Sequence, residues 1–416
     1  MSTRDLIPIP GGSIDECDIS LVYSLQKWAE TEVISKRLEF QEDYDRLLYP
    51  ALQNLLVNIE MQKLLWKEEY GGAEHNSSQV AITLAHALEQ VGRADTGIGF
   101  ICAATYALSS TFALEDNMNN ELCREFAPLF CEGDKPMLAS LILPAYGREE
   151  SNYHPHFRGK YLQATATRKG EEWLINGSDM RPLNSGADAE IFGVFCALEG
   201  EQEPGFFLVP ADSPGIKRGE MFLKTGLAAS RNSNLDMEGV RVPANRLIFR
   251  GEQPYIEMMA WLHMGMSAVT VGSLFAAYEI IRDWGDNRVI KGKGQIFKEN
   301  PLTASLMAEV SHEILLSRLL THQLAQMLST PEGSPYSSGE EYDRVYIFSL
   351  SIANQVTHAA EKAINNIMEL MGSAGYATEW NLERYWRDVK TMQLHLGNWE
   401  LNKMDIARYF YRCQEI

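Results

Sequence analysis

Apolar residues recur every three to four positions through most of the first 135 residues. The spacing is clear in DISLVYSLQKWAETEVISKRLEF (18–40) and in SSQVAITLAHALEQVGRAD (77–95), and it is typical of amphipathic helices. Turn-forming residues such as EEYGGAEHN (68–76) lie between the helical stretches. The pattern predicts an N-terminal helical domain over residues 1–135.

From residue 136 the chain changes to short runs of β-branched and aromatic residues. KYLQATATRKGEEWLING (160–177) alternates apolar and polar positions around a predicted turn at Lys169-Gly170. AEIFGVFCAL (189–198) and GFFLVP (205–210) are further strand-like runs. The pattern predicts a middle β-domain over residues 136–250.

The helical period returns after residue 250 and continues to the end of the chain. It is clear in MAWLHMGMSAVTVGSLFAAYEIIRDWGDNR (259–288) and in TASLMAEVSHEILLSRLLTHQLAQML (303–328). The polar stretch STPEGSPYSSGEEYD (329–343) predicts a loop between two helices. We therefore expect a C-terminal helical bundle over residues 251–416, and an α+β fold overall.

The chain of 416 residues is acidic, with 37 Lys and Arg against 56 Asp and Glu and a formal net charge of −19. Nucleic acids and anionic membranes attract clustered Lys and Arg. Neither is therefore expected as the main partner.

The cysteines and the apolar runs indicate in which cellular compartment the protein is expected. Six scattered cysteines show no CxxC and no Cys/His ligand spacing, which predicts reduced thiols and no metal site. No apolar run approaches the roughly 18 residues of a membrane-spanning helix. The start MSTRDLIPIPGG lacks the layout of a signal peptide. We expect a soluble cytoplasmic protein without membrane insertion.

Several segments resemble motifs of the acyl-CoA dehydrogenase family. LLWKEEYGG (64–72) is similar to the family's PEEYGG, ALEQVGRADTGIG (87–99) to EELARADAS, and WLINGSDM (173–180) to YVLNGxKxW. LERYWRDVKTMQLHLGNWELNKMDIAR (382–408) resembles VERxxRDAxIxxIYEGTNEIxxxxIAR. The resemblance covers nearly the whole chain, and GSAGYATEWNLERYWRDVK (372–390) is its most specific part.

The resemblance implies the acyl-CoA dehydrogenase fold, with an N-terminal helical domain, a central β-barrel-like domain and a C-terminal four-helix bundle. It implies FAD between the β-domain and the C-terminal helices, and an acyl thioester carried by CoA or an acyl carrier protein. It also implies a homotetramer, or a hetero-oligomer with an active paralogue. The family reaction is removal of an α-proton by a carboxylate with hydride transfer to the flavin.

The catalytic carboxylate of the family is missing at both of its usual positions. The family's YEGT corresponds to residues 395–398, HLGN, so that Leu396 replaces the glutamate. The second position, in the first helix after the β-domain, is Leu262. His263 and His395 lie beside these two positions, and imidazole is the usual acid–base group near neutral pH. Leu396 indicates either lost catalysis or a base elsewhere, with His263 and His395 as candidates.

The resemblance also places residues at the flavin ring. The family's VTEPGAGSD and WIT segments correspond to residues 141–149, LILPAYGRE, and residues 181–183, RPL. Leu141, Leu143 and Leu183 are the cofactor-binding candidates there, and the family's hydroxyl donors are lost.

Further cofactor candidates come from the phosphate and adenine end of FAD. The family's RxxFGxPI corresponds to residues 288–295, with Arg288 retained, and its QxxGGxGY corresponds to residues 369–376, with Glu369 in place of Gln and Gly372 retained. Asn398 is the remaining candidate. A buried donor removed without replacement costs about 1–3 kcal/mol, so the combined losses argue against ordinary FAD binding.

Other notable residues have simpler interpretations. Asp95 is interpreted as a local polar contact, and Cys102 as a small apolar residue lining a pocket. Arg384, Arg387 and Asp388 are interpreted as structural ion pairs.

Three functions stay open at this point. The first is a flavoenzyme that oxidises an acyl thioester with an unusual base or substrate. The second is a non-catalytic partner subunit of a heteromeric dehydrogenase. The third is a flavin-free hydratase, lyase or isomerase that uses the acyl pocket.

Overall fold

The computed structural model describes residues 14–73, 79–114, 118–145, 160–286, 288–329, 339–395 and 398–412. Its N-terminal part is helical, as the apolar spacing predicts. Helix α6 shows why one element begins where it does, because Oδ1 of Asp95 accepts a hydrogen bond from the Ile98 amide at 2.9 Å and so caps the helix. The helices are α2 (Glu16–Trp28), α3 (Arg37–Glu42), α4 (Tyr44–Leu52), α5 (Val80–Ala94), α6 (Thr96–Ser110) and α7 (Asn120–Cys131).

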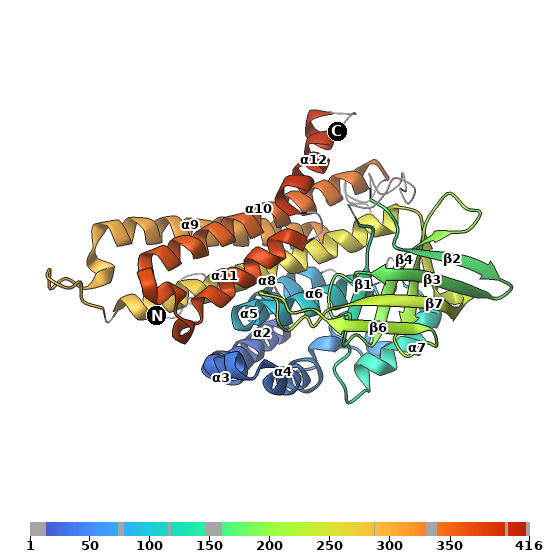
Figure 1. The fold of residues 1–416 in the computed structure, drawn as a ribbon, viewed down its shortest axis with the longest axis horizontal. Helices are drawn as coiled ribbons and strands as arrows, with labels where there is room; N and C mark the ends of the chain where they lie inside the picture. The colour runs from blue at the N-terminus through green and yellow to red at the C-terminus, as the bar shows by residue number, and fades with distance from the viewer. Residues whose placement is uncertain are drawn as a thin grey trace.

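The middle part forms one sheet at one end of the molecule (Figure 1). Its order is β6-β7-β3-β2-β4-β5-β8, and β1 pairs in parallel with β4. The strands are β1 (Ala139–Ile142), β2 (Ala164–Lys169), β3 (Glu172–Met180), β4 (Ile191–Leu198), β5 (Gly205–Pro210), β6 (Ile216–Met221), β7 (Ser233–Pro243) and β8 (Leu247–Arg250).

Two expectations about the sheet can be compared with this topology. The predicted turn at Lys169-Gly170 is confirmed, since β2 and β3 pair antiparallel up to Lys169 and Glu172, and Gly170 has a φ of +66°. The barrel-like form is not found: among the described strands the sheet ends at β6 and β8, so it stays open.

Long helices make up the C-terminal part, and they extend away from the sheet (Figure 1). The loop predicted at 329–343 is too long, because α10 already begins at Gly339, and residues 330–338 lie outside the described residues. The helices are α8 (Gln253–Asp286), α9 (Pro301–Leu328), α10 (Gly339–Met371), α11 (Leu382–Leu394) and α12 (Asn398–Tyr411).

The expectation that no apolar run approaches the length of a membrane-spanning helix is wrong for helix α8. Its residues Pro254–Asp286 are long and apolar enough to span a membrane by length and composition. However, 89% of the most apolar window is buried inside the protein. The apolar character of α8 is therefore explained by its position at the centre of the helical core.

Small residues let α8 approach the N-terminal helices closely. A Cβ atom on Gly272 would lie 2.0 Å from the backbone oxygen of Glu89, and one on Gly92 would lie 2.2 Å from that of Val269. Side chains of the N-terminal and C-terminal helices share one hydrophobic core, while much of the sheet has a second core of its own.

A buried polar network ties α11 to the rest of the chain. Arg384 forms an ion pair with Asp95, and the Tyr44 hydroxyl also donates a hydrogen bond to Asp95. Asp388 accepts a hydrogen bond from the Leu227 amide at 2.5 Å. The structural interpretation of Arg384, Asp388 and Asp95 is confirmed.

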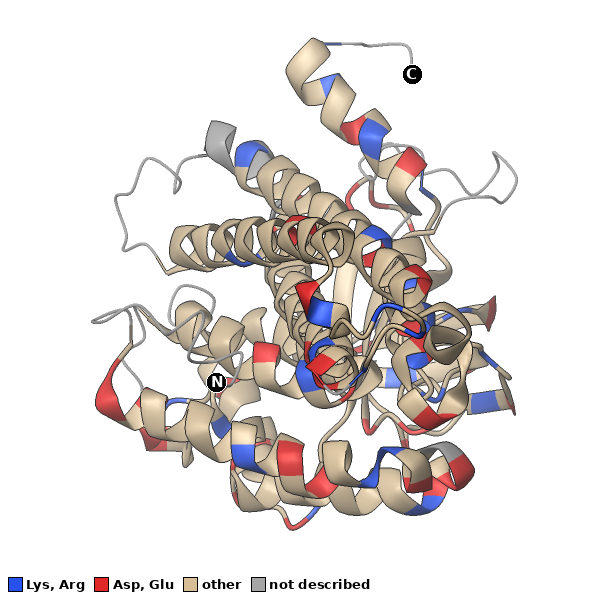
Figure 2. Cartoon of the chain, turned by 90° about the vertical axis from the view of Figure 1, so that its left-hand side faces the viewer, with Lys and Arg blue, Asp and Glu red and all other residues tan. Residues whose placement is uncertain are grey.

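Charged residues on the outer helices are mixed in sign. Figure 2 shows blue and red positions interleaved along the helices that face the viewer, without a continuous basic face there.

Candidate active site

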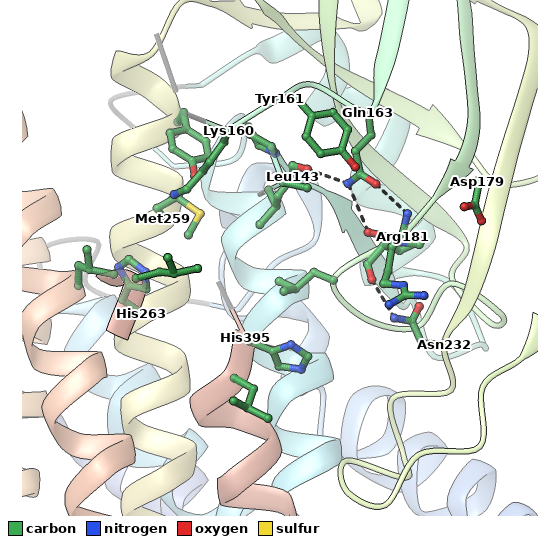
Figure 3. Close-up of a pocket in the computed structure, with 18 of the residues that line it drawn as sticks. Leu143, Lys160, Tyr161, Gln163, Asp179, Arg181, Asn232, Met259, His263 and His395 are labelled. Carbon is green, nitrogen blue, oxygen red and sulfur yellow. Dashed lines mark hydrogen bonds between the residues drawn. The ribbon is translucent and has the colours of Figure 1, made fainter. Parts of the chain in front are cut away.

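A cavity of about 880 Å³ lies where the sheet meets helices α8, α10 and the end of α11. Figure 3 shows His263 on the helical side, His395 near the centre, and Leu143, Arg181 and Asn232 on the side of the sheet. Its volume lies in the range of small-molecule sites. The lining residues that matter below are Leu143, Lys160, Gln163, Asp179, Arg181, Leu183, Lys224, Asn232, Met259, His263, Tyr346, Leu350 and His395.

The orientation of His263 is fixed by α10. Nδ1 of His263 lies 2.8 Å from Oγ of Ser349, and this hydroxyl donates to the Tyr346 carbonyl at 2.8 Å. Ser349 therefore accepts a hydrogen bond from Nδ1–H, which leaves Nε2 as the unprotonated nitrogen. The buried Nε2 atom has no hydrogen-bond partner among the described residues. Burial lowers the pKa of His263 to about 3, and the charge of Lys160 adds to this effect.

His395 follows the last residue of α11 and lies flat against α6. Its ring stacks on Phe100, with the centroids 4.8 Å apart and the planes 10° from parallel. Its Nε2 atom is buried and has no partner within the described ranges. Burial lowers the pKa of His395 to about 4, and nearby Lys224 contributes in the same direction.

Positive charge lines the cavity in an otherwise acidic chain. Lys160, Arg181 and Lys224 line it, and Asp179 is the one acidic residue among the described lining residues. The Lys224 ammonium donates hydrogen bonds to the carbonyls of Leu227, at 3.0 Å, and Ser230. Burial lowers the pKa of Lys224 to about 8, although the Asp388 carboxylate opposes the shift. Such a lining suits an anionic ligand.

The sheet side of the cavity is held together by the side chain of Gln163. Its Nε2 donates to the Leu143 carbonyl at 2.9 Å and to the Arg181 carbonyl at 3.4 Å, and its Oε1 accepts from the Arg181 amide at 2.8 Å (Figure 3). The Leu183 amide donates to the Leu141 carbonyl at 2.7 Å.

The structure gathers some of the predicted site residues. His263, His395, Leu143 and Leu183 line the cavity, and Leu141 is buried directly behind its wall. Leu262 is fully buried in the hydrophobic core. Their roles in catalysis and cofactor binding stay predictions.

Two of the predicted residues cannot be placed in the same detail. Leu396 lies outside the described residues, and Asn398 begins α12 with a side chain that is not described.

The candidates for the phosphate and adenine end lie far from this cavity. Glu369 follows the lining residue Leu350 by 19 positions in α10, which at 1.5 Å per residue corresponds to about 28 Å. Gly372 directly follows this helix, and Arg288 lies in the α8–α9 connection with its guanidinium over the Trp284 ring. Within one chain these three residues do not reach the cavity.

Gln163, Lys160 and Lys224 were not found by sequence reasoning. Gln163 precedes β2 in an alternating stretch, where a polar residue is ordinary, and no local pattern indicates that its amide would bridge two strands. Lys224 lies in a loop before β7, and the carboxylate that acts on its charge, Asp388, belongs to the distant α11.

A second polar cluster lies between α5 and α9. Donor atoms of His86, Glu89 and His322 lie within 4.8 Å of one another. The Arg318 Nε atom is 3.0 and 3.1 Å from the two oxygens of Glu89, so the guanidinium already neutralises this carboxylate. Burial raises the pKa of Glu89, but Arg318 and His322 outweigh burial and hold it at about 2. The cluster is best described as a buried ionic bridge between two helices.

Known proteins match this fold and sequence. A family model described as acyl-CoA dehydrogenase, C-terminal domain, matches residues 251–410. A probable acyl-CoA dehydrogenase of Bacillus subtilis, YngJ, is 25% identical over 353 residues, covering 82% of this chain and 84% of the relative.

Solved structures of acyl-CoA dehydrogenases have a similar fold. Butyryl-CoA dehydrogenase from Megasphaera elsdenii has a TM-score of 0.78 at 19% identity, covering 96% of this chain and 99% of that one. A glutaryl-CoA dehydrogenase from Mycobacterium smegmatis, solved in complex with FADH2, has a TM-score of 0.77 at 17% identity, with 96% of each chain covered. These matches and the order of elements agree with the motifs from Tyr70 to Arg408: residues 251–410 form an acyl-CoA dehydrogenase C-terminal domain, and the relatives and the fold support membership of the chain in the acyl-CoA dehydrogenase family.

Proposed function

We propose that this protein binds an acyl thioester in the central cavity and transfers a proton at the α-carbon of the acyl group. Proton removal is the acid–base half of the dehydrogenation for which its relatives are named. The observation that carries the proposal is a pair of imidazole rings, His263 and His395, that line one cavity and each have a buried Nε2 atom without a partner among the described residues.

The cavity lining supports a thioester of CoA or of an acyl carrier. Met259 and Leu350 offer apolar contacts for an acyl chain. Arg181 and Lys224 offer positive charge for the phosphate groups that both carriers contain.

The proton transfer can be written with residues of this chain alone. The lone pair of His263 Nε2 takes the α-proton, and the electrons of the C–H bond move to the thioester oxygen to give an enolate. Positively charged groups such as Lys224 stabilise the negative charge of this oxygen. The tautomer of His263 suits the step, because the hydrogen bond to Ser349 holds the proton on Nδ1 and keeps Nε2 open.

The family uses FAD, so the sheet side of the cavity must be compared with the needs of a flavin ring. Such a ring needs hydrogen-bond donors for its nitrogen and oxygen acceptors. In the segment Arg181–Leu183 both backbone amides already donate within the protein, and Pro182 has none. The wall as it stands does not fit the ring, and the proton transfer above does not depend on it.

Exchange of the α-proton with solvent tests the proposal. Wild-type protein in D2O should incorporate deuterium at the α-carbon of butyryl-CoA, measured by mass spectrometry. Removal of the general base should slow this exchange about 100-fold or more. We therefore expect slow exchange in His263→Gln or His395→Gln, and unchanged exchange in His312→Gln, whose side chain is exposed on α9. If both cavity variants exchange at the wild-type rate, the proposal is wrong.

The second candidate is a partner subunit that completes another chain's site. It is favoured by the position of Glu369, about 28 Å along α10 from the cavity-lining Leu350, since a binding residue this far from the chain's own cavity can complete the site of a neighbouring molecule. Native mass spectrometry of protein purified from its source would detect a second, related chain. A homo-oligomer would exclude this alternative.

A further inference from the structure

We propose that Gln163 closes the slot between residues 141–143 and residues 181–183, where this family holds the flavin ring. We also propose that the protein works without FAD. The inference builds on the proposed function for the remaining chemistry of the cavity. It concerns a different part of the site, namely the sheet side rather than the two imidazole rings.

The backbone of residues 181–183 is almost fully engaged within the protein. The Arg181 amide donates to Gln163 and the Leu183 amide donates to Leu141. The Pro182 carbonyl accepts from Nδ2 of Asn232 at 2.8 Å. Because proline has no N–H, this segment keeps no backbone donor for a ligand.

The carbonyl groups of the facing segment are engaged as well. The Leu141 oxygen accepts from Leu183, and the Leu143 oxygen accepts from Gln163. One glutamine amide thus joins residue 143 to residue 181 across the wall through three hydrogen bonds. A primary amide has two N–H donors and a carbonyl oxygen, so Gln163 uses both of its polar ends here.

The side chains at positions 141, 143 and 183 do not replace the missing backbone donors. Leu143 and Leu183 carry no polar atom, and Leu141 is fully buried. Arg181 stands where the family has an aromatic residue, and its guanidinium lies over the Phe222 ring, 5.0 Å from the centroid. A flavin ring that entered the slot would have to break the hydrogen bonds of Gln163, and it would find no hydroxyl donor to replace them.

The residue expected at the adenine end of FAD also argues against FAD binding. Glu369 replaces the amide that the family offers there, and it accepts a hydrogen bond from the Tyr376 hydroxyl at 2.7 Å. A carboxylate has no N–H, so the donor of the family's amide is lost at this position.

The first measurement uses the full-length wild-type chain. Purified protein should be colourless, should release no flavin on denaturation, and should not quench FAD fluorescence in a titration. Stoichiometric flavin in the purified protein, or saturable quenching by added FAD, would overturn the inference.

A pair of variants tests the part assigned to Gln163. Gln163→Ala, alone and combined with Leu183→Thr, should bind FAD at least tenfold more tightly than the wild type. Gln53→Ala is the matched control, since this half-buried side chain also donates to a backbone carbonyl, that of Asp134 at 2.9 Å, and does not line the cavity. If Gln163→Ala raises FAD affinity no more than Gln53→Ala does, Gln163 is not the closing residue.

The two proposals can fail separately. Protein that binds flavin and still exchanges the α-proton of butyryl-CoA would contradict the closed slot and leave the proposed proton transfer in place. Colourless protein that does not exchange the proton would support the closed slot and contradict the proton transfer.

Discussion

Nδ1 of His263 and Oγ of Ser349 lie 2.8 Å apart, and this contact joins α8 to α10 at the floor of the cavity. Removing the hydroxyl in Ser349→Ala leaves a buried N–H without an acceptor. We expect a loss of about 1–3 kcal/mol in the free energy of unfolding, together with slower α-proton exchange. Urea denaturation and the exchange rate measure the two effects.

Ser351→Ala is the matched control for Ser349→Ala. Ser351 lies two residues further along the same helix, and its hydroxyl has no hydrogen-bond partner among the described residues. Its removal should change neither the stability nor the rate appreciably. Equal effects of the two substitutions would contradict the role given to Ser349.

The ion pair of Asp95 and Arg384 should contribute strongly to stability. Both side chains are buried, and breaking a buried pair by removing one charge costs about 3–5 kcal/mol. Asp95→Asn removes the charge, while asparagine can still cap α6. Glu238→Gln is the comparison, because its pair with Lys217 is exposed and should contribute little to stability. Similar losses in the two variants would argue against the buried network.

Buried neutral histidines should make the fold sensitive to acid. Burial lowers the pKa of His86 to about 3 and that of His263 to about 3, from 6.5. Below pH 6.5 the unfolded chain binds protons that the folded chain does not, so stability falls as the pH falls toward 3. Each such group contributes about 1.4 kcal/mol per pH unit.

The variant His86→Gln should therefore lose stability less steeply between pH 6 and pH 4 than the wild type. Denaturation midpoints measured across this range give the slope. A slope equal to that of the wild type would mean that His86 is protonated in the folded protein.

Gly272→Ala should destabilise the protein, although glycine to alanine in a helix interior usually stabilises by about 0.5–1 kcal/mol. The added Cβ would lie 2.0 Å from the Glu89 backbone oxygen, where α5 cannot give way without separating from α8. We expect a loss of about 1–3 kcal/mol. In Gly285→Ala the added Cβ would lie 3.1 Å from the Phe297 ring and from no backbone atom, so the loss of stability should be smaller. A gain in thermal stability for Gly272→Ala would show that the helices are less tightly packed.

The sequence allowed the type and order of the elements to be predicted because their periods are local properties. The turn at Gly170 is an example, since a glycine between two alternating runs needs no distant contact to be recognised. The openness of the sheet was not predictable in this way, because it depends on which strands pair at its edges.

The candidate site was predictable only where motifs mark it. His263 and His395 were found because they neighbour the vacated carboxylate positions, and both line the cavity. Gln163 and Lys224 were missed because their roles arise from contacts between segments distant in the sequence. Arg384 was expected in an ion pair, but its partner Asp95 could be identified only from the packing of α11 against the N-terminal helices.

The most direct measurement is the fate of the α-proton of a bound thioester in D2O. We predict that butyryl-CoA incubated with the wild-type protein gains deuterium at the α-carbon only, with no flavin added, and that pivaloyl-CoA, which has no α-proton, gains none. Butyryl-CoA that binds the protein but gains no deuterium would contradict the account.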